Sequence, residues 1–356
     1  MSVNSVSPEH ALRSLDGYDR IIDARSESEF ALDRLPGAVN WPTLNDEQRH
    51  IVGTEYKQVS PFAARKRGAA LSARNIADHI ERELGDAGRD WRPLVYCWRG
   101  GKRSGSLALV LDQIGFKVDL VEGGYQGLRR ALVTSLDELA PTLRYQVLCG
   151  TTGSGKSRLL QVLQGAGEQV LDLEAIAEHR GSVLGLVPGV VQPSQKAFDT
   201  RVWDQLRRFD PGRPVWVESE SKKVGALRVP DALIDAIRQS PCWRIDLSVD
   251  ARVALLMADY DFFVADIEAF CERLDALREL RGSDVIDRWQ AAARSGAVED
   301  VVRELLLLHY DPIYLRSIER NFAGYRDATV LQPRDGSWEA LREVAKGLTT
   351  GNLALP

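Results

Sequence analysis

A cysteine at the end of an apolar run is the first residue of this chain whose setting suits chemistry. Cys97 follows Leu-Val-Tyr at 94–96, and a turn rich in glycine and cations leads from it into a helical stretch at 106–111. Inward backbone N–H groups, a helix N-terminus and basic side chains favour a thiolate over a thiol. We therefore predict that Cys97 is a nucleophile in an anion cradle. The cradle consists of Trp98, Arg99, Gly100, Gly101, Lys102, Arg103 and Ser104.

A second motif, at residues 150–157, matches the phosphate-loop pattern G-x-x-x-x-G-K-[ST] at every position. Its residues are Gly150, Thr151, Thr152, Gly153, Ser154, Gly155, Lys156 and Ser157. Residues 145–149 are typical of the buried strand before such a loop, and residues 157–163 of the helix after it. Backbone amides would surround a di- or triphosphate, Lys156 would reach its terminal phosphates, and the Ser157 hydroxyl would be a candidate Mg²⁺ ligand.

The sequence also predicts polar residues near the ends of two further strands, close to the phosphate loop. Glu218 ends the strand at 215–217, where phosphate-loop proteins orient magnesium or water, so we treat it as a second candidate Mg²⁺ ligand. Asp172 and Glu174 end the neighbouring strand at 168–173 in a similar way. The candidate supporting residues are Asp172, His179, Arg180, Glu218 and Glu220.

Composition favours a soluble globular protein with more than one domain. The chain has 356 residues, 44% of them hydrophobic and 27% charged, and a net charge of −5. No apolar run reaches membrane-spanning length, and residues 1–9 lack the features of a signal peptide. The four cysteines are scattered, without a C-x-x-C pair, which favours a reducing cytoplasm. We expect a cytoplasmic protein that does not bind membranes.

The order of elements predicts two α/β domains, at 1–138 and 139–356. In the first, short strands alternate with helices and form a small parallel sheet with helices on both faces. Residues 43–68 hold turn formers and few periodic apolar positions, so we expect an irregular segment there. The second domain is predicted to be an α/β fold around the phosphate loop, followed by an almost wholly helical extension at 251–320.

Charge is distributed unevenly, although the chain as a whole is acidic. Residues 45–104 hold 12 Lys and Arg against 8 Asp and Glu, which makes this span the best candidate for contact with a polyanion.

Several motifs together resemble one family. Asp-Ala-Arg-Ser at 23–26, Pro-Gly-Ala at 36–38 and the cysteine cradle resemble the rhodanese fold. Val-Gly-Thr-Glu-Tyr-Lys-Gln at 52–58, His-Arg-Gly-Ser at 179–182 and Glu-Ser-Glu-Ser at 218–221 extend the likeness. With the cradle and the phosphate loop, they make nearly the whole chain resemble the bacterial tRNA 2-selenouridine synthases.

This resemblance implies a reaction that composition alone does not give. Such enzymes replace the sulfur of 2-thiouridine at the wobble position of certain tRNAs with selenium from selenophosphate. An S-geranylated intermediate, made from geranyl diphosphate, turns the sulfur into a good leaving group. The implied partners are therefore tRNA and an enzyme that supplies selenophosphate.

The resemblance also assigns roles to the two motifs. Cys97 would handle selenium while Arg99, Lys102 and Arg103 steady the donor. The phosphate loop would bind the prenyl diphosphate with magnesium, although a nucleotide there stays an open alternative. The apolar residues 183–188 are a candidate slot for the ten-carbon chain.

Three other functions fit parts of the sequence. The C-x5-R spacing from Cys97 to Arg103 suits a phosphate-sized anion and so also fits a phosphatase, although Tyr96 stands where such enzymes commonly place His. A rhodanese-type sulfurtransferase fused to a nucleotide-binding domain is a second alternative. A tRNA-binding regulator with a degenerate site is a third, against which the intact Cys97 and Lys156 argue.

Overall fold

The computed structural model describes residues 3–179, 191–259 and 266–350. The chain forms two compact units, the first made of 1–136 with 193–204 and the second of 137–192 with 205–356. Within the described ranges, no helix combines the length and the apolar character needed to cross a bilayer.

The first unit includes a helix that the sequence analysis assigned to the second domain. This helix, α9 (Gln195–Leu206), contacts α6 (Gly124–Leu139). Trp203 Nε1 donates to Ser135 Oγ at 3.1 Å, and Arg129 donates to the Lys196 carbonyl at 3.1 Å and forms an ion pair with Asp199. These contacts place 193–204 with the first unit.

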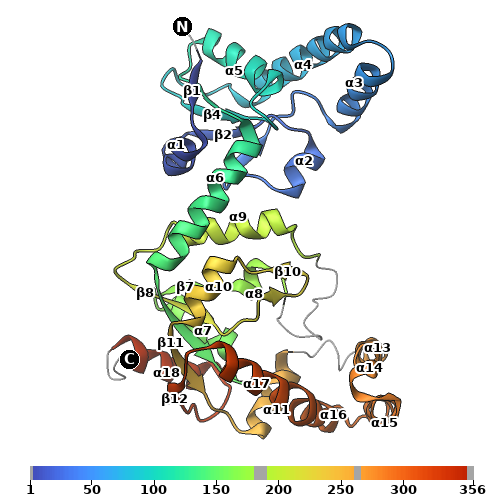
Figure 1. Ribbon diagram of the computed structural model, residues 1–356, viewed down its shortest axis with the longest axis vertical. Helices are drawn as coiled ribbons and strands as arrows, with labels where there is room; N and C mark the ends of the chain where they lie inside the picture. The colour runs from blue at the N-terminus through green and yellow to red at the C-terminus, as the bar shows by residue number, and fades with distance from the viewer. Residues whose placement is uncertain (1–2, 180–190, 260–265, 351–356) are drawn as a thin grey trace. The chain divides into compact units, whose positions relative to one another are not determined.

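The first unit is built on a five-stranded sheet. Its strands are β1 (Asn4–Val6), β2 (Arg20–Asp23), β3 (Ala38–Asn40), β4 (Pro93–Tyr96) and β5 (Asp119–Val121). They are all parallel, in the order β1-β5-β4-β2-β3, which confirms the predicted parallel sheet. The helices around it include α1 (Pro8–Arg13), α2 (Glu27–Leu32), α5 (Lys102–Ile114) and α6 (Figure 1). Every residue of the central strand β4 is buried.

Residues 43–68 are mostly helical, so the expected irregular segment is wrong. Helix α3 (Asp46–Gln58) begins at a capping box formed by Asn45 and Gln48, and α4 (Pro61–Glu83) begins after Ser60, whose side chain caps it. All of α3 lies within the described residues, and none of its side chains is buried. The helix therefore lacks the apolar period on which sequence prediction depends. Figure 1 shows α3 and α4 as a hairpin that extends from the sheet.

A buried histidine fastens α4 to the body of the first unit. The His79 ring stacks on Trp41 with centroids 5.6 Å apart, and Nε2 lies 3.2 Å from the Pro42 carbonyl oxygen. Arg82 lies 3.1 Å from the other ring nitrogen. Burial lowers the pKa of His79 below its ordinary value of 6.5, although the contact with Pro42 acts in the opposite direction.

We expect this histidine to make the stability of the protein depend on pH. Because its pKa is lower in the folded state, the unfolded chain takes up a proton first as the pH falls below about 6.5. The stability present above that pH is therefore lost as the pH falls toward 5. Thermal unfolding of wild type and His79→Gln between pH 7.5 and 5 checks this, and the variant should show the shallower decline. Equal declines in the two proteins would contradict it.

The second unit is built on another five-stranded parallel sheet, which agrees with the α/β fold predicted for it. Its strands are β6 (Arg144–Cys149), β7 (Gln169–Leu171), β8 (Pro214–Glu218), β11 (Pro241–Ile245) and β12 (Gly324–Leu331). They lie in the order β12-β11-β6-β8-β7. Helices α7 (Lys156–Gly165), α10 (Asp231–Arg238) and α18 (Trp338–Thr349) belong to this unit, as does the short hairpin of β9 (Lys223–Val224) and β10 (Leu227–Arg228). Its core includes Leu148, Leu159, Trp216, Trp243 and Leu341.

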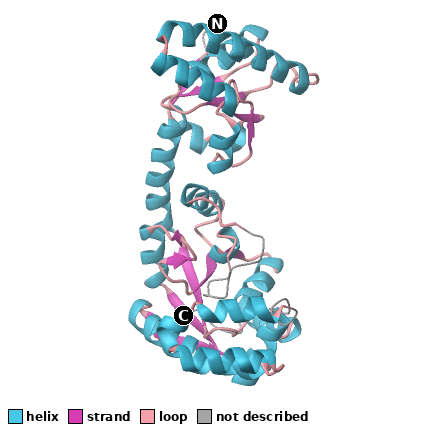
Figure 2. Ribbon diagram, turned by 90° about the vertical axis from the view of Figure 1, so that its right-hand side faces the viewer, coloured by secondary structure: helices cyan, strands magenta, loops and turns pink. Residues whose placement is uncertain are grey.

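The helical extension is also as predicted in the part of it that the structure describes. It consists of α11 (Val249–Asp259), α13 (Ile267–Asp275), α14 (Arg278–Arg281), α15 (Ser283–Arg294), α16 (Val298–Glu304), a π-helical turn (Leu305–Tyr310) and α17 (Asp311–Asn321). Phe270, Leu274 and Trp289 lie in a hydrophobic cluster of their own. Figure 2 shows the strands of each unit flanked by helices.

Candidate active sites

Cys97 lies where the sequence analysis expected it, just beyond the carboxyl end of β4. The residue is 3% exposed and belongs to the hydrophobic cluster that also includes Ala24, Trp41 and Leu107. The Ser104 hydroxyl, itself fully buried, donates a hydrogen bond to the sulfur at 3.0 Å. The sulfur therefore lies among apolar residues and also contacts a polar group from the first turn of α5.

Glycines let the backbone close around the cysteine. Gly100 has φ +65°, and a Cβ there would lie 2.8 Å from the Val121 carbonyl oxygen. Gly124 has φ +53°, and a Cβ there would lie 2.2 Å from the Cys97 carbonyl oxygen. Only glycine fits either position. This close approach lets the Tyr125 N–H donate to the Cys97 carbonyl at 2.7 Å, so the start of α6 holds the cradle.

A buried ion pair also supports the glycine-rich turn that follows Cys97. Arg25 binds Asp23 at 2.6 Å and donates to the Asp33 carbonyl at 2.6 Å, and its guanidinium lies 3.9 Å from the centre of the Tyr125 ring. The Tyr125 hydroxyl donates to the Asp33 carboxylate at 2.6 Å. Asp23 and Arg25 of the rhodanese-like motif therefore position the cradle through Tyr125.

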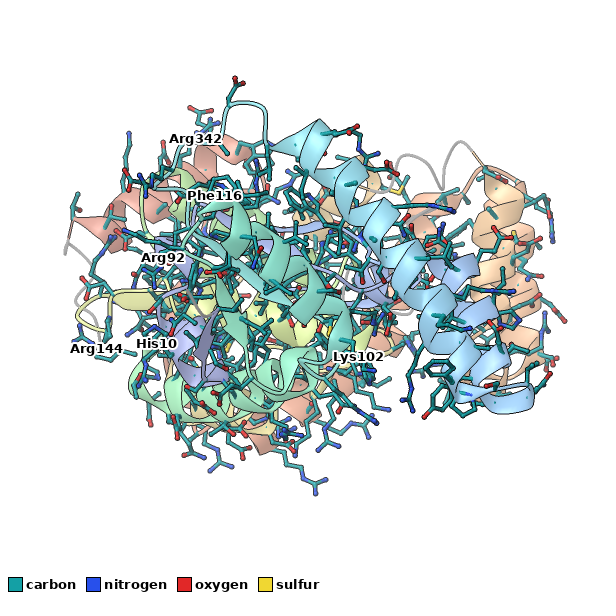
Figure 3. All side chains as sticks on the ribbon, turned by 90° about the horizontal axis from the view of Figure 1, so that it is seen from above. His10, Arg92, Lys102, Phe116, Arg144 and Arg342 are labelled. Carbon is teal, nitrogen blue, oxygen red and sulfur yellow. The ribbon has the colours of Figure 1, made fainter. Side chains whose placement is uncertain are left out.

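The three cations of the cradle differ in their surroundings. Arg103 donates to the Glu29 carboxylate at 2.7 Å. Burial raises the pKa of Glu29. The hydrogen bond from Arg103 and its positive charge act in the opposite direction, and the pKa of Glu29 lies below its ordinary value. Arg99 is exposed and donates to the Gln126 side chain at 3.2 Å, and Lys102 is exposed at the start of α5 (Figure 3). Arg99 and Lys102 are thus placed to meet an anion from solvent.

Tyr96, which occupies the position of a phosphatase histidine, is fully buried in the core. Its hydroxyl accepts a hydrogen bond from the Leu35 N–H at 3.3 Å. Burial holds the pKa of this phenol well above its ordinary value. The residue therefore has a structural role, and a general acid or base at this position finds no support.

The phosphate loop connects β6 to α7 in the second unit, as predicted. Lys156 Nζ donates to the Gly150 carbonyl at 2.8 Å and lies 5.5 Å from the centre of the Tyr314 ring. Tyr314 also accepts a hydrogen bond from the Gly150 N–H at 2.8 Å and shares one with Ser219 at 2.8 Å. A side chain from α17 therefore helps to hold the loop.

Three glutamates meet next to this loop. Glu174, Glu218 and Glu220 bring carboxylate oxygens within 4.8 Å of one another. Burial, together with the charges of Glu218 and Glu220, raises the pKa of Glu174 to about 10. Burial raises the pKa of Glu218 to about 7, even though the charge of Lys156 lowers it. Like charges in so small a volume call for a cation or protons.

The donor set fits a magnesium ion. Mg²⁺ prefers oxygen ligands, and the glutamates supply them at the phosphate loop, whose Ser157 hydroxyl is a further oxygen ligand. Glu218 Oε1 is buried and has no hydrogen-bond partner among the described residues. Ser157, Glu218 and Glu220 would hold the ion, which would help a diphosphate to leave by neutralising its charge.

The other predicted residues of this site have different surroundings. Asp172 caps α8 (Leu173–Ile176) by accepting from the Ala175 N–H at 2.8 Å, and burial raises its pKa. His179 is buried, and its Nδ1 has no partner among the described residues. Arg180 and the candidate slot at 183–188 lie outside the described residues.

One cavity of about 830 Å³ is lined by the phosphate loop and by apolar side chains. Its polar lining includes the loop, Asp172, His179 and the three glutamates. The apolar part of its lining, called here the apolar wall, includes Leu255, Leu256, Ile313, Phe322 and Trp338. The apolar wall and Tyr314 were not predicted, because segments from distant parts of the chain contribute them and no local motif marks them.

Two family models match this sequence. One is the rhodanese-like domain, over residues 7–131, and the other is described as the tRNA 2-selenouridine synthase AAA domain, over residues 143–281. The chain is 36% identical over 244 residues to a tRNA 2-selenouridine synthase from Nitrosomonas europaea. The aligned region covers 67% of this chain and 63% of that protein. It is 32% identical over 326 residues to one from Alcanivorax borkumensis, covering 83% and 88%. A solved rhodanese-related protein from Thermoplasma volcanium matches 36% of this chain and 91% of its own, with 17% identity and a TM-score of 0.24.

Proposed function

Because the chain belongs to the tRNA 2-selenouridine synthase family, we propose that it exchanges the sulfur of a wobble 2-thiouridine in tRNA for selenium. In the first step the sulfur attacks carbon 1 of geranyl diphosphate, the C–O bond breaks and diphosphate leaves. In the second step the selenium of selenophosphate attacks carbon 2 of the base and geranylthiolate leaves, after which water attacks phosphorus, the P–Se bond breaks and inorganic phosphate is released. These substrates place the reaction in the cytoplasm, with a selenophosphate-supplying enzyme as a partner.

The observation that carries this proposal is the cavity of the second unit, whose lining combines a phosphate loop with an apolar wall. Its phosphate loop suits a diphosphate, and Leu255, Leu256 and Ile313 belong to the apolar wall. Burying each CH₂ group contributes about 0.8 kcal/mol, so this wall favours a prenyl chain over a polar ribose. A cavity with both kinds of lining is what a prenyl diphosphate requires.

The cradle of the first unit supports the selenium step. Selenophosphate is a tetrahedral anion, and the glycine turn, the N-terminus of α5, Arg99 and Lys102 all favour such a ligand. Cys97 lies at the base of this turn, where its sulfur can handle the selenium. We assign donor binding to the cradle and prenyl transfer to the phosphate loop.

Mass spectrometry of tRNA tests the proposal directly. We expect 2-thiouridine tRNA to gain one geranyl group when incubated with protein, Mg²⁺ and geranyl diphosphate, and to exchange sulfur for selenium when selenophosphate is added. Omitting either co-substrate should stop the reaction at the corresponding step. An unchanged tRNA in the complete mixture, or Cys97-dependent hydrolysis of a generic aryl phosphate, would refute the proposal.

A further inference from the structure

We propose that the hairpin of α3 and α4 (residues 46–83), called here the α3–α4 arm, is the surface that binds the RNA substrate beside Cys97. It would hold phosphates with its cations and stack unpaired bases on its exposed rings. This inference rests on the proposed function, because it takes tRNA as the substrate. It goes further by assigning RNA binding to a particular part of the chain.

The part of the arm from Tyr56 to Ala77 carries positive charge without any compensating acid in its own sequence. Residues 56–77 contain five Lys and Arg and no Asp or Glu, in a chain whose net charge is −5. All five cations are exposed, namely Lys57, Arg65, Lys66, Arg67 and Arg74. Arg67 forms an ion pair with Glu55 at 3.3 Å, just outside this stretch. Such a patch on an acidic protein is the electrostatic signature of polyanion binding.

Large apolar side chains lie exposed among these cations. Tyr56 is 50%, Val59 76% and Phe62 67% exposed, and Lys66 Nζ lies 5.2 Å from the centre of the Phe62 ring. Exposed rings beside cations are what single-stranded RNA requires, because unpaired bases stack on aromatic faces while the backbone meets Lys and Arg. A wobble base lies in such an unpaired loop.

The base of the arm is fixed next to the cysteine cradle. The Glu29 carboxylate receives Arg103 of the cradle at 2.7 Å and also lies 3.5 Å from Arg49 of α3. The Ser28 hydroxyl donates to Asp46, the first residue of α3, at 2.6 Å. Helix α4 also packs against α5, which begins at Lys102. A nucleotide at Cys97 therefore has the arm as its neighbour.

The dimensions of the arm suit this arrangement. Thirteen helical residues of α3 span about 20 Å, so Tyr56 and Lys57, near the far end of α3, lie several nucleotides away from the cradle. A base that reacts at Cys97 must leave its stack, and its flanking nucleotides must be held for that to happen. Figures 1 and 3 show the two helices extending from the body of the first unit.

RNA is a better occupant for this surface than a protein partner. The cores of protein interfaces are depleted in lysine, whereas in the arm Lys66 contacts the exposed Phe62 ring and Lys57 directly follows the exposed Tyr56. A selenophosphate-supplying enzyme is the protein alternative, and the experiment below separates it from RNA.

The first test removes charge from the arm of the full-length protein. The arm variant changes Lys57, Arg65, Lys66 and Arg74 to Gln and leaves the pair of Arg67 with Glu55 intact. The control variant changes four exposed cations of the same unit to Gln, namely Arg13, Arg20, Arg89 and Lys117. Arg20 begins β2 and Lys117 precedes β5, so these two lie at the amino ends of the strands, opposite Cys97.

Binding of 2-thiouridine tRNA is measured by fluorescence anisotropy at several salt concentrations. We expect the arm variant to bind at least tenfold more weakly, and the slope of log K against log salt to become shallower by about 0.7 to 0.9 for each phosphate contact removed. The control variant should stay within about twofold of wild type. Both variants should unfold at the wild-type temperature, because all the changed side chains are exposed.

A second variant tests stacking separately from charge. The double change Tyr56→Ala and Phe62→Ala should weaken tRNA binding by about tenfold or more while leaving the salt slope unchanged. A loss of charge and a loss of stacking thus give different signatures, which a general structural defect would not reproduce.

The outcomes distinguish this inference from the proposed function. Wild-type protein that neither binds nor modifies tRNA would overturn the proposed function, and the arm assignment with it. If the wild-type protein modifies tRNA and the arm variant binds tRNA as tightly as wild type does, only the assignment of RNA binding to the arm is wrong. Equal losses in the arm and control variants would also overturn it. The arm assignment would also be wrong if the arm variant bound tRNA normally and lost selenium incorporation only when a donor-supplying enzyme provided the selenophosphate. That pattern would indicate that the arm binds a protein partner.

Discussion

Cys97→Ser abolishes selenium incorporation and leaves geranylation of the same tRNA largely intact. This is the expected result because the selenium step is assigned to the cradle and the prenyl step to the phosphate loop. A serine hydroxyl is a far weaker nucleophile than a thiol, so selenation should fall by at least about a thousandfold. The substitution keeps the size and the Ser104 contact, so the fold should remain. Mass spectrometry of the tRNA measures both products in one sample.

A second buried cysteine provides the matched control. Cys271 lies in the core of the helical extension, and Cys271→Ser should retain both activities. If Cys97→Ser loses geranylation and selenation equally while unfolding like wild type, one site performs both steps and the division of labour proposed here is wrong.

The parallel sheets could be predicted because their strands are apolar and end in recognisable residues. Leu94, Val95 and Tyr96 form a fully buried central strand, and a glycine-rich turn follows it. In the second unit, the phosphate-loop spacing fixes a strand before it and a helix after it, and both are observed. Buried parallel strands appear in sequence as short continuous apolar runs, which is why this part of the prediction succeeded.

The arm and α9 could not be predicted in the same way. Helix α3 buries none of its side chains, all of which the structure describes, so its sequence shows caps and helix formers but no apolar period. The packing of helix α9 against α6 depends on contacts such as Trp203 with Ser135. Those contacts join positions 68 residues apart, which a local pattern does not reveal.

The same distinction between local motifs and long-range contacts applies to the candidate sites. Cys97 and Lys156 belong to contiguous motifs whose chemistry is readable from spacing alone. Tyr314 and most of the apolar wall come from the helical extension, whereas Trp338 begins α18. Tyr314 also lies beyond residue 281, where the second family match ends. The sequence therefore indicated where phosphate would bind, whereas the volume and polarity of the rest of the cavity needed the tertiary structure.

Lys156→Ala impairs geranyl transfer first. The ammonium group of Lys156 lies over the phosphate loop, where it can donate to the departing diphosphate, and its charge lowers the pKa of Glu218. Removing it costs a charge-assisted contact and raises the pKa of Glu218, which weakens the candidate magnesium site as well. We expect kcat/KM for geranyl diphosphate to fall about a hundredfold or more. Quantifying S-geranylated tRNA at several concentrations of the donor gives this value.

Pre-geranylated tRNA makes the test decisive, because it enters the reaction after the step that needs the phosphate loop. Supplied with this tRNA and selenophosphate, Lys156→Ala should selenate at the wild-type rate, whereas Cys97→Ser should not selenate at all. Lys346→Ala, which removes an exposed lysine from α18 of the same unit, should behave as wild type in both steps. A Lys156→Ala protein that geranylates normally and fails to selenate would assign the phosphate loop to the selenium step, since only a group acting there could give that pattern.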